Sequence, residues 1–380
     1  MSIWLIFLGL TFIAFLAGIL YLISRVGRFN FIKKLSKDKK WTKRGISLAL
    51  ILVVVTALII IWSMINAMIV LLHFVMIWLI CDLIAWICSL VTGQKSKASN
   101  LSKPYYTGII AVSLTIIYLC ICYFLAHNVW ITQYKLSSDK NIQPLRIALL
   151  ADSHVGTLED GDGFAKKISV INDYNPDVVI LAGDFVDDSS PRDVMTQAAT
   201  ALGNLNSKHG VYYVFGNHDR GYYQNGQKPL RGYNADELQD TLEEAGVHVM
   251  MDDILCPCDG YAIIGRLDKS FENTDGRSRE PINSLMTKID DKTYSIIIDH
   301  QPGDYDNEAS AGADLVLSGH THGGQMIPIT WVGEWLGMND STYGLKHIGN
   351  TDFITTSGIS DWEIQFKSGC KSEIVIIDID

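Results

Sequence analysis

Four long apolar stretches in the first third of the chain restrict its fold more than any other feature. They cover about residues 3–24, 46–66, 68–93 and 105–127. A helix of about 20 apolar residues crosses a bilayer core about 30 Å thick, so each stretch is long enough to span it. We therefore expect residues 1–127 to form an all-α transmembrane region of four helices, with a tight hairpin near residues 66–67.

The distribution of basic residues predicts the orientation of this region. Residues 1–127 contain 12 Lys and Arg residues against two acidic ones, and the basic residues cluster at 25–44 and 95–103. Basic loops remain in the cytoplasm, and with four spans both loops lie there only if the N-terminus is outside. We then expect a multi-pass protein of the cell membrane whose remaining residues are extracytoplasmic. A miscounted span would reverse that orientation.

The sequence leaves two features of the chain open. Asp82 lies near the middle of the third stretch, where a carboxylate costs several kcal/mol unless it is paired or protonated. Either it makes a buried contact with another helix or handles protons, or it is a neutral, hydrogen-bonded acid. Outside the stretches lie Cys256, Cys258 and Cys370. An odd number gives no disulfide framework, and a bridge from Cys256 or Cys258 to Cys370 is left open.

Beyond residue 127 the sequence has the composition of a globular domain. We expect a linker at 128–144 and a separate domain at 145–380. Residues 128–380 carry 19 basic and 39 acidic residues, a net charge of −20. Affinity for nucleic acids depends on Lys and Arg that neutralise phosphates. The charge therefore argues against a nucleic-acid partner and against a nuclease.

Five short apolar runs in this domain each end in polar residues. Between them lie helix-like stretches at 162–175 and 234–245. Apolar strands that alternate with helices predict sheets covered by helices, and the carboxyl ends of such strands form the site. Polar residues at the end of one strand are common in ordinary turns, but five such strand ends in succession predict a functional site. The polar ends supply Asp152, His154, Asp184, Asn217, His218, Asp219, His300, His320 and His322.

The residue types at these strand ends suit a metal centre. Three Asp or Asn oxygens and four imidazoles fit two divalent transition metals, Mn, Fe or Zn, better than Mg or Ca, which prefer oxygen ligands. Residues i and i+2 of an extended segment point to one face, so His320 and His322 are expected to serve two neighbouring ions. Two such ions, about 3.5–4 Å apart, activate water and hold a phosphoryl group. The pattern therefore predicts hydrolysis of a phosphoester.

The order of these motifs, D-x-H, G-D, G-N-H-D, H and G-H-x-H, resembles that of the calcineurin-like metallophosphoesterases. The segments "GNHD", "DHQP", "LSGHTHGGQ" and "TSGISDWEIQFKSG" are similar to the membrane-associated bacterial branch of that superfamily. The resemblance covers about residues 140–380. It implies an α/β fold, a two-sheet αββα sandwich, with a dinuclear metal centre.

The resemblance also implies a role for each residue of the site. His218 would contact the substrate and protonate the leaving group. Asp219 would fix the tautomer of the His218 ring. The segment "GDFVDDSS" lacks the G-D-x-x-D-R-G motif of serine/threonine phosphoprotein phosphatases, so the pattern departs from that family. Lys367 stands where related sequences often carry arginine and is a candidate phosphate contact. The first ion would be bound by Asp152, His154 and His322, the second by Asn217, His300 and His320, and Asp184 would bridge them.

An apolar segment, "MIPITWVGEWLGM", follows the last histidine. Trp331, Val332, Trp335 and Leu336 have helical spacing in it. Either this helix packs on the sheet, or it forms an apolar flap in which Trp331 and Trp335 contact a lipid substrate. We therefore expect a membrane-anchored dinuclear-metal phosphoesterase acting on a monoester or diester, with a lipid or envelope phosphate as candidate substrate. The alternative is a membrane sensor or scaffold with a non-catalytic domain, against which the complete ligand set argues.

Overall fold

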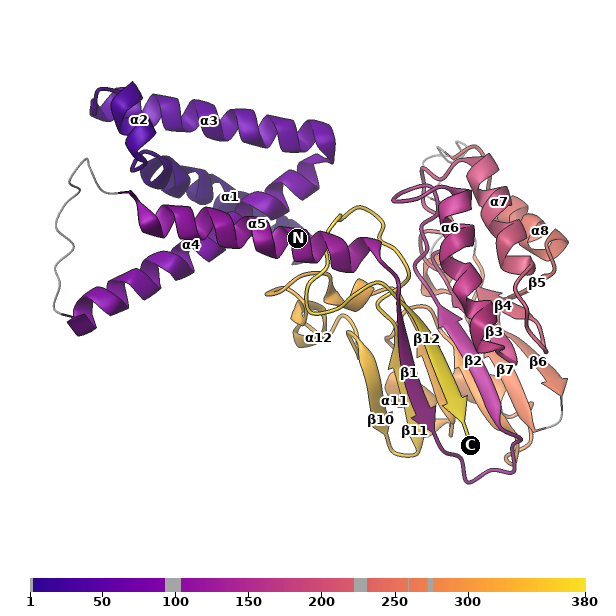
Figure 1. Cartoon of the computed structure of the whole chain (residues 1–380). Coiled ribbons are helices and arrows are strands. Elements are labelled where there is room, and N and C mark those ends of the chain that lie inside the picture. The colour runs from indigo at the N-terminus through magenta and orange to yellow at the C-terminus, as the bar shows by residue number, and fades with distance from the viewer. Residues whose placement is uncertain (1–2, 93–103, 222–230, 259, 273–275) are drawn as a thin grey trace. The chain divides into compact units, whose positions relative to one another are not determined.

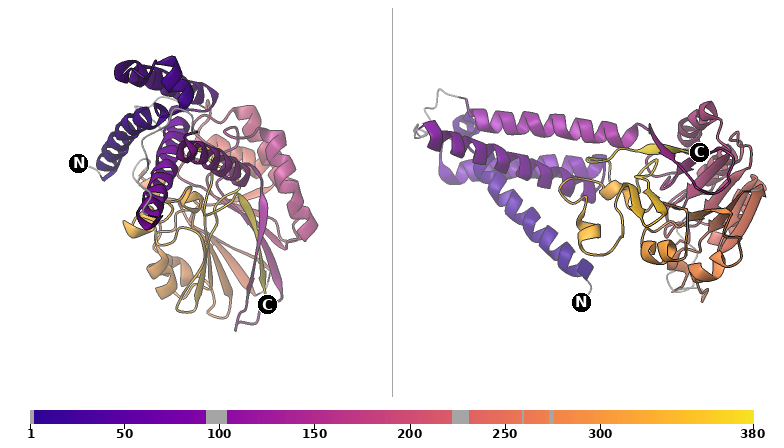
Figure 2. Two further views of the ribbon diagram at one scale, coloured as in Figure 1. Left: turned by 60° about the vertical axis from the view of Figure 1, so that its left-hand side comes forward. Right: turned by 90° about the horizontal axis from the view of Figure 1, so that it is seen from below.

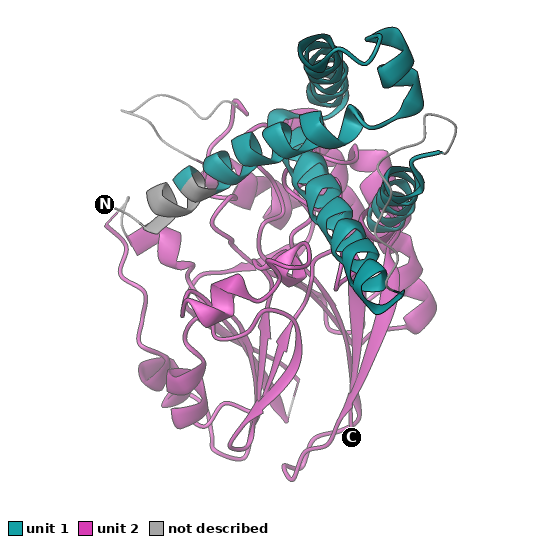
Figure 3. Ribbon diagram, turned by 90° about the vertical axis from the view of Figure 1, so that its left-hand side faces the viewer, with its two compact units in different colours: residues 1–122 teal, residues 123–380 magenta. Residues whose placement is uncertain are grey.

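The chain divides into two compact units, Met1–Cys122 and Tyr123–Asp380 (Figure 3). The structure is a computed structural model that describes residues 3–92, 104–221, 231–258, 260–272 and 276–380, apart from the side chains of residues 3–8 and 10.

The first unit is all α-helical (Figure 1). Three of its helices, α3, α4 and α5, are long and apolar enough to cross a membrane. The first predicted span, 3–24, coincides with α1, whose described apolar part is Thr11–Val26, so a fourth span stays a prediction. The predicted basic loop at 95–103 lies outside the described residues. The helices are α1 Ile3–Val26, α2 Asn30–Leu35, α3 Lys40–Ile61, α4 Met64–Thr92 and α5 Tyr106–His127.

The turn between α3 and α4 comes earlier than predicted. It lies between Ile61 and Met64 and not near residues 66–67. The hydroxyl of Ser63 accepts hydrogen bonds from the backbone N–H of Asn66 at 3.2 Å and from its side-chain amide at 3.0 Å. The first turn of a helix has N–H groups without intrahelical partners, and a serine hydroxyl satisfies one of them. Ser63 therefore caps α4, which begins at the next residue, Met64.

Asp82 joins α4 to α1 through polar contacts. Its Oδ2 lies 2.7 Å from Nε of Arg25 and accepts a hydrogen bond from the hydroxyl of Tyr21 at 2.7 Å. Among apolar helices, a cationic partner and a hydroxyl donor stabilise a carboxylate that would otherwise be costly. Of the two alternatives for Asp82, the contact with another helix is the one observed.

The second unit is a sandwich of two six-stranded mixed sheets with helices on the outside (Figures 1 and 2). The order of strands is β1-β12-β2-β3-β4-β5 in one sheet and β10-β11-β9-β8-β7-β6 in the other. The predicted two-sheet αββα architecture is confirmed. The strands are β1 Trp130–Leu136, β2 Leu145–Leu150, β3 Val178–Ala182, β4 Val211–Val214, β5 Val247–Met250, β6 Asp253–Cys258, β7 Tyr261–Gly265, β8 Tyr294–Ile298, β9 Leu315–Ser318, β10 Gly344–Ile348, β11 Thr351–Thr355 and β12 Glu373–Ile379.

Helices cover the outer faces of both sheets. The predicted helix 162–175 divides into an α-helix and a 3-10 helix, and the predicted helix 234–245 is observed with a capping box at Asn234 and Glu237. The helical segments are α6 Gly161–Ile168, η1 Ser169–Tyr174, α7 Arg192–Gly203, α8 Ala235–Glu244, α9 Lys269–Glu272, α10 Ile282–Met286, α11 Tyr305–Ser310, η2 His322–Gly324 and α12 Val332–Trp335.

Three apolar layers stabilise this unit. Ile180 and Ile296 lie in the core between the two sheets. Phe164 and Leu202 pack α6 and α7 on the outer face of the first sheet, and Leu285 packs α10 on the second. Because the central strands are covered on both faces, β3 and β8 are buried along their whole length. This explains why their sequences are nearly continuous apolar runs.

The predicted linker, 128–144, contains strand β1. This strand pairs in parallel with β12 along its whole length, from Trp130 to Leu136. Its sequence, "WITQYKL", mixes apolar and polar residues, as is typical of an edge strand with one covered face. Only residues 128 and 129 separate it from the end of α5.

The strand directions fix where the polar strand ends lie. β1 runs away from the last turn of α5, and β12 runs parallel to it. β2 is antiparallel to β12 and therefore runs back toward that turn. β3 and β4 are parallel to β2. Their carboxyl ends therefore lie at the end of the sheet where the chain enters from α5 (Figure 1).

Candidate metal centre

The seven predicted ligands follow strands of both sheets. In the first sheet the strands are β2, β3 and β4, which are neighbours, and in the second they are the neighbours β8 and β9. Parallel strands end at a common edge, so side chains that follow them converge. The ligands after β2 are Asp152 and His154, after β3 Asp184, after β4 Asn217, after β8 His300, and after β9 His320 and His322.

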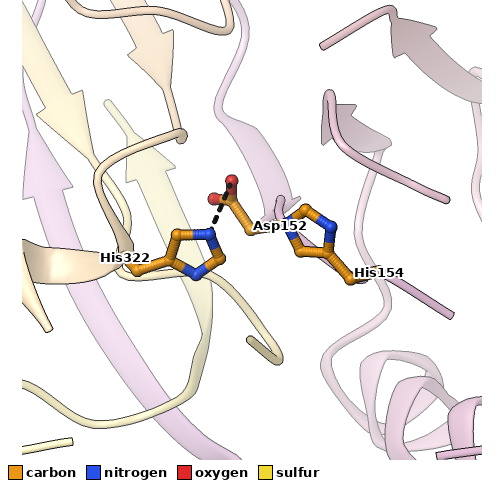
Figure 4. A group of neighbouring side chains, drawn as sticks. All are labelled: Asp152, His154 and His322. Atoms are coloured by element: carbon orange, nitrogen blue, oxygen red, sulfur yellow. Dashed lines mark ion pairs between the residues drawn. The ribbon is translucent and has the colours of Figure 1, made fainter. Parts of the chain in front are cut away.

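Asp152, His154 and His322 form a first group of side chains (Figure 4). One ligand atom from each lies within 4.8 Å of the others. Nε2 of His322 is 3.9 Å from Oδ1 of Asp152, and the rings of His154 and His322 stack at 5.2 Å between centroids. Ligands about 2.0–2.2 Å from one ion are about 3–4 Å apart. The group therefore has the spacing of side chains around a metal ion.

Asp184, His300 and His320 form a second group, with ligand atoms again within 4.8 Å of one another. Nε2 of His300 lies 3.2 Å from Oδ2 of Asp184 and 3.3 Å from Oδ1 of Asn217. Nδ1 of His300 donates to the carbonyl of Ala182 at 2.7 Å. Burial lowers the pKa of His300, but Asp184 and Asp152 outweigh that effect and raise it well above its ordinary value. A cation between Nε2 and the two oxygens would take the place of the proton on Nε2.

Asp184 of the second group also lies beside the first. Its Oδ2 lies 3.2 Å from Nε2 of His300 in the second group and 3.7 Å from Nε2 of His154 in the first. Its Oδ1 accepts a hydrogen bond from the backbone N–H of His218 at 2.9 Å. A carboxylate in this place is positioned to bridge two ions.

Five of the seven predicted ligands have a left-handed backbone. The φ angles are 54° at Asp152, 41° at His154, 52° at Asp184, 71° at His320 and 49° at His322. This conformation costs a non-glycine residue about 1–2 kcal/mol and is concentrated at functional sites. It also corrects the expected geometry of His320 and His322, since that segment is not extended. The turn sends His320 to the second group and His322 to the first.

Two glycines leave room for the carboxylates. A Cβ at Gly216 would lie 2.2 Å from Oδ1 of Asp184, and a Cβ at Gly319 would lie 2.6 Å from Oδ2 of Asp152. Any side chain at either position would displace a ligand. The glycines of "GNHD" and "SGH" are therefore part of the site.

The protonation of two of the four imidazoles fits divalent cations directly. Burial lowers the pKa of His154 and of His320 to about 3, so both rings are neutral and carry the lone pair that a metal requires. Both ring nitrogens of buried His154 lack a hydrogen-bond partner among the residues that the structure describes. Buried nitrogens normally have such partners, and the adjacent carboxylates suit a cation in that place.

His218 lies beside the centre, and its partner is Asp187. Nδ1 of His218 is 3.3 Å from Oδ1 of Asp187. The structure does not support Asp219 as this partner, because Asp219 accepts hydrogen bonds from the backbone N–H groups of Val186 at 2.9 Å and Gly216 at 2.7 Å. Asp219 instead ties together the two loops that follow β3 and β4. The signal for Asp187 was present in "GDFVD", as a second carboxylate three residues after the first.

The surrounding carboxylates set the charge of His218. Burial lowers its pKa, but Asp187, Asp184 and Asp219 outweigh that effect and raise the pKa to about 9. His218 is therefore protonated at neutral pH. Bound cations would repel this proton and lower the pKa.

A buried carboxylate, Asp361, lies behind His322. Its Oδ1 is 3.1 Å from Nδ1 of His322, and the ammonium of Lys367 is 3.7 Å from it. Lys367 donates to the carbonyls of Ser357 at 2.7 Å and Ser360 at 3.2 Å and has no exposed surface. Lys367 therefore does not meet a substrate as predicted but supports Asp361. A carboxylate behind a ligand histidine fixes the orientation of its ring.

The predicted apolar segment is exposed and is not a core helix. Trp331 and Trp335, at α12, have 46% and 74% of their surface exposed. The indole of Trp362 lies beside the catalytic candidate, with its ring 5.9 Å from that of His218 between centroids. Trp362 belongs to the segment "TSGISDWEIQFKSG", but no feature of the sequence singled it out. The three cysteines Cys256, Cys258 and Cys370 are free.

Residues 145–324 match the model of the calcineurin-like phosphoesterase family. They contain all seven predicted ligands and His218. Residues 145–324 form a calcineurin-like phosphoesterase domain. The fold and the recognition from sequence are thereby confirmed.

The chain has metallophosphoesterase relatives in bacteria and animals. An uncharacterized metallophosphoesterase of Helicobacter pylori is 31% identical over 242 residues, which are 63% of this chain and 60% of that protein. One of Campylobacter jejuni is 27% identical over 292 residues, 76% of this chain and 73% of that protein. A transmembrane protein with metallophosphoesterase domain from Bos taurus is 27% identical over 307 residues, which are 77% of this chain and 66% of that protein. The chain spans about 60% of the length of the Helicobacter relatives.

Proposed function

We propose that this chain hydrolyses a phosphoester at a centre of two divalent cations. The observation that carries the proposal is the pair of ligand groups, in which Asp184 of the second also lies beside the first. Four imidazoles among the seven ligands favour Mn, Fe or Zn over Mg or Ca. The family to which residues 145–324 belong supports the same reaction class.

The chemistry follows from the charges at the centre. Two divalent cations bound there would offset the carboxylates, polarise phosphoryl oxygens and lower the pKa of a water. His218, protonated and beside the centre, is placed to give its proton to the leaving oxygen. Asp187, at 3.3 Å from Nδ1, holds the ring so that Nε2 remains free for this transfer. Trp362 covers one side of that ring.

We also infer that the domain is anchored in the cell membrane and faces away from the cytoplasm. The basic residues at 25–44 lie before α3 and at its start, and they support a cytoplasmic position for this end of the helix. With three crossings by α3, α4 and α5, Tyr123–Asp380 would lie on the opposite side, whether or not α1 spans the bilayer. Protease added to intact cells should degrade this unit. Degradation only after lysis would reverse the orientation.

The reaction is tested with the full chain in detergent. Hydrolysis of p-nitrophenyl phosphate and bis-p-nitrophenyl phosphate would be measured with Mn²⁺ and with a chelator, together with bound metal. We expect metal-dependent turnover that is lost in Asp184→Asn, and turnover near wild type in His248→Asn, which changes an exposed histidine of β5. A chain that binds metal but turns over neither ester, or a wild-type rate in Asp184→Asn, would refute the proposal.

A further inference from the structure

The last turn of α5 marks the membrane boundary of the second unit. The helix has 22 residues, a length of about 33 Å, and the bilayer core is about 30 Å thick. The helix therefore exceeds the core by about 3 Å, or about two residues, so that its end at His127 lies at the edge of the core. Trp130 begins β1 three residues later, and three residues reach at most about 10 Å. The end of the sheet where β1 starts is consequently held at the bilayer surface.

The metal ligands lie at this same end of the sheet. β1 runs away from α5, and β2 runs back toward it. The carboxyl ends of β2, β3 and β4, which carry the ligands of the first sheet, therefore point toward the end of α5. The strand directions alone therefore place these ligands at the end of the sheet where β1 begins.

Residues 365–372 connect the end of α5 to the site. Ser372 donates from its backbone N–H to the carbonyl of Leu125 at 3.0 Å and from its hydroxyl to that of Ala126 at 2.6 Å. His127 and Gln365 are in contact at 3.2 Å through Nε2 and Oε1. The same stretch begins three residues after Trp362, which lies beside the centre, and four after Asp361, which lies behind it.

The interfacial loop, residues 327–338, is attached to this stretch. Ser368 donates from its backbone to the carbonyl of Gln325 at 2.9 Å, and its hydroxyl accepts from the backbone N–H of Ile327 at 3.0 Å. Gln325 donates from Nε2 to the carbonyl of Phe366 at 3.0 Å. The loop begins five residues after His322, a predicted ligand. It is therefore fixed between the site and the part of the unit at the membrane boundary.

The interfacial loop is unusually apolar for an exposed segment. Its only charged residue is Glu334, which accepts a hydrogen bond from Thr342 at 3.1 Å. Tryptophan is enriched where proteins meet the headgroup region of a bilayer, and a contiguous exposed apolar patch marks a docking surface. The exposed apolar side chains are Ile327, Ile329, Trp331, Trp335, Leu336 and Met338.

We propose that the interfacial loop inserts into the headgroup region of the bilayer and that the site hydrolyses the phosphoester of a membrane lipid. The inference rests on the proposed function and names its substrate class. Water adds its oxygen to the lipid phosphorus, the bond from phosphorus to the glyceryl oxygen breaks, and that oxygen takes up a proton. Phosphatidic acid would give diacylglycerol and inorganic phosphate.

The test uses the full chain reconstituted in phosphatidylcholine vesicles that contain phosphatidic acid or phosphatidylglycerol, with Mn²⁺. Products released from the lipid and from added p-nitrophenyl phosphate are measured in the same preparation. The loop variant combines Ile329→Ser and Leu336→Ser, both at exposed positions. The matched control is Leu255→Ser, an exposed apolar residue on β6, the edge strand of the second sheet.

We expect lipid hydrolysis by the wild type and the control, a decrease of about tenfold or more in the loop variant, and equal rates of the three proteins on the soluble ester. Quenching of tryptophan fluorescence by brominated lipid should weaken in the loop variant alone. Hydrolysis of the soluble ester without lipid hydrolysis, or a loop variant as fast as the control, would overturn this inference and leave the proposed function intact. Loss of both activities in the wild type would overturn both.

Discussion

Replacing Asp187 by asparagine should slow the hydrolysis of alkyl phosphates much more than that of p-nitrophenyl phosphate. The substitution keeps the shape of the side chain but removes the charge 3.3 Å from Nδ1 of His218. The pKa of His218 is about 9 instead of 6.5, and that difference corresponds to about 3 kcal/mol in favour of the protonated ring. Of the three carboxylates responsible, Asp187 makes the largest contribution, so its share exceeds about 1 kcal/mol.

The expected loss of rate follows from this share and from the role of the proton. General acid catalysis contributes about 100- to 10,000-fold, and asparagine still restrains the ring. We therefore expect kcat for a methyl or glyceryl phosphate to fall about 10- to 100-fold. An alkoxide needs a proton to leave, whereas p-nitrophenolate leaves without one. For the nitrophenyl ester we expect a change of less than about threefold.

The assay compares both esters at saturating substrate with the full chain in detergent and Mn²⁺. Asp188→Asn serves as the control, because it removes the same charge one residue further along the chain. The rate ratio of the two esters should change only in Asp187→Asn. If Asp187→Asn slowed both esters equally, its effect would be on metal binding or folding, and the assignment of His218 as proton donor through Asp187 would be refuted.

Three further outcomes follow from the site and its surroundings. Asp361→Asn, which removes the carboxylate behind His322, should weaken Mn²⁺ binding about 10- to 100-fold; an unchanged calorimetric affinity would contradict this. Gly216→Ala places a Cβ 2.2 Å from Oδ1 of Asp184, and it should abolish turnover while the circular dichroism spectrum stays unchanged. Wild-type activity in this variant would show instead that the loop after β4 can move aside. Burial raises the pKa of the Cys370 thiol to about 11. Near pH 8 this thiol is therefore protonated and unreactive. Mass spectrometry should find iodoacetamide attached to exposed Cys256, and to Cys370 only after urea is added. Equal labelling of the two cysteines without urea would show that Cys370 is not buried.

The strands and the ligands could be predicted from the sequence because one local pattern encodes both. An apolar run such as "DVVILAGD" predicts a strand covered on two faces, and the polar residue at its end predicts the place where that strand reaches the site. The five runs could be identified without knowing which strands are neighbours in the sheets. The two sheets and the place of Asp184 between the ligand groups were expected only from the resemblance to the calcineurin-like metallophosphoesterases.

Interactions between distant segments could not be read from the sequence. "GDFVD" and "GNHD" each offer a carboxylate to His218, and only the folded distance selects Asp187 over Asp219. Lys367 suggested a phosphate contact by its charge, but its neighbours Asp361 and Ser357 come from the same folded loop and bury it. The left-handed backbone at His320 likewise depends on the surrounding loops, since local preference disfavours it.

The position of β12 between β1 and β2 has a consequence for biosynthesis. Trp130 pairs with Glu373, a residue that the ribosome adds about 12–50 s later at about 5–20 residues per second. Throughout this interval β1 has no neighbour and one edge of β2 is open. Unpaired strand edges recruit other strands, and membrane-bound nascent chains are crowded in two dimensions. A chaperone that covers β2 during translation is therefore expected to increase the yield of folded protein.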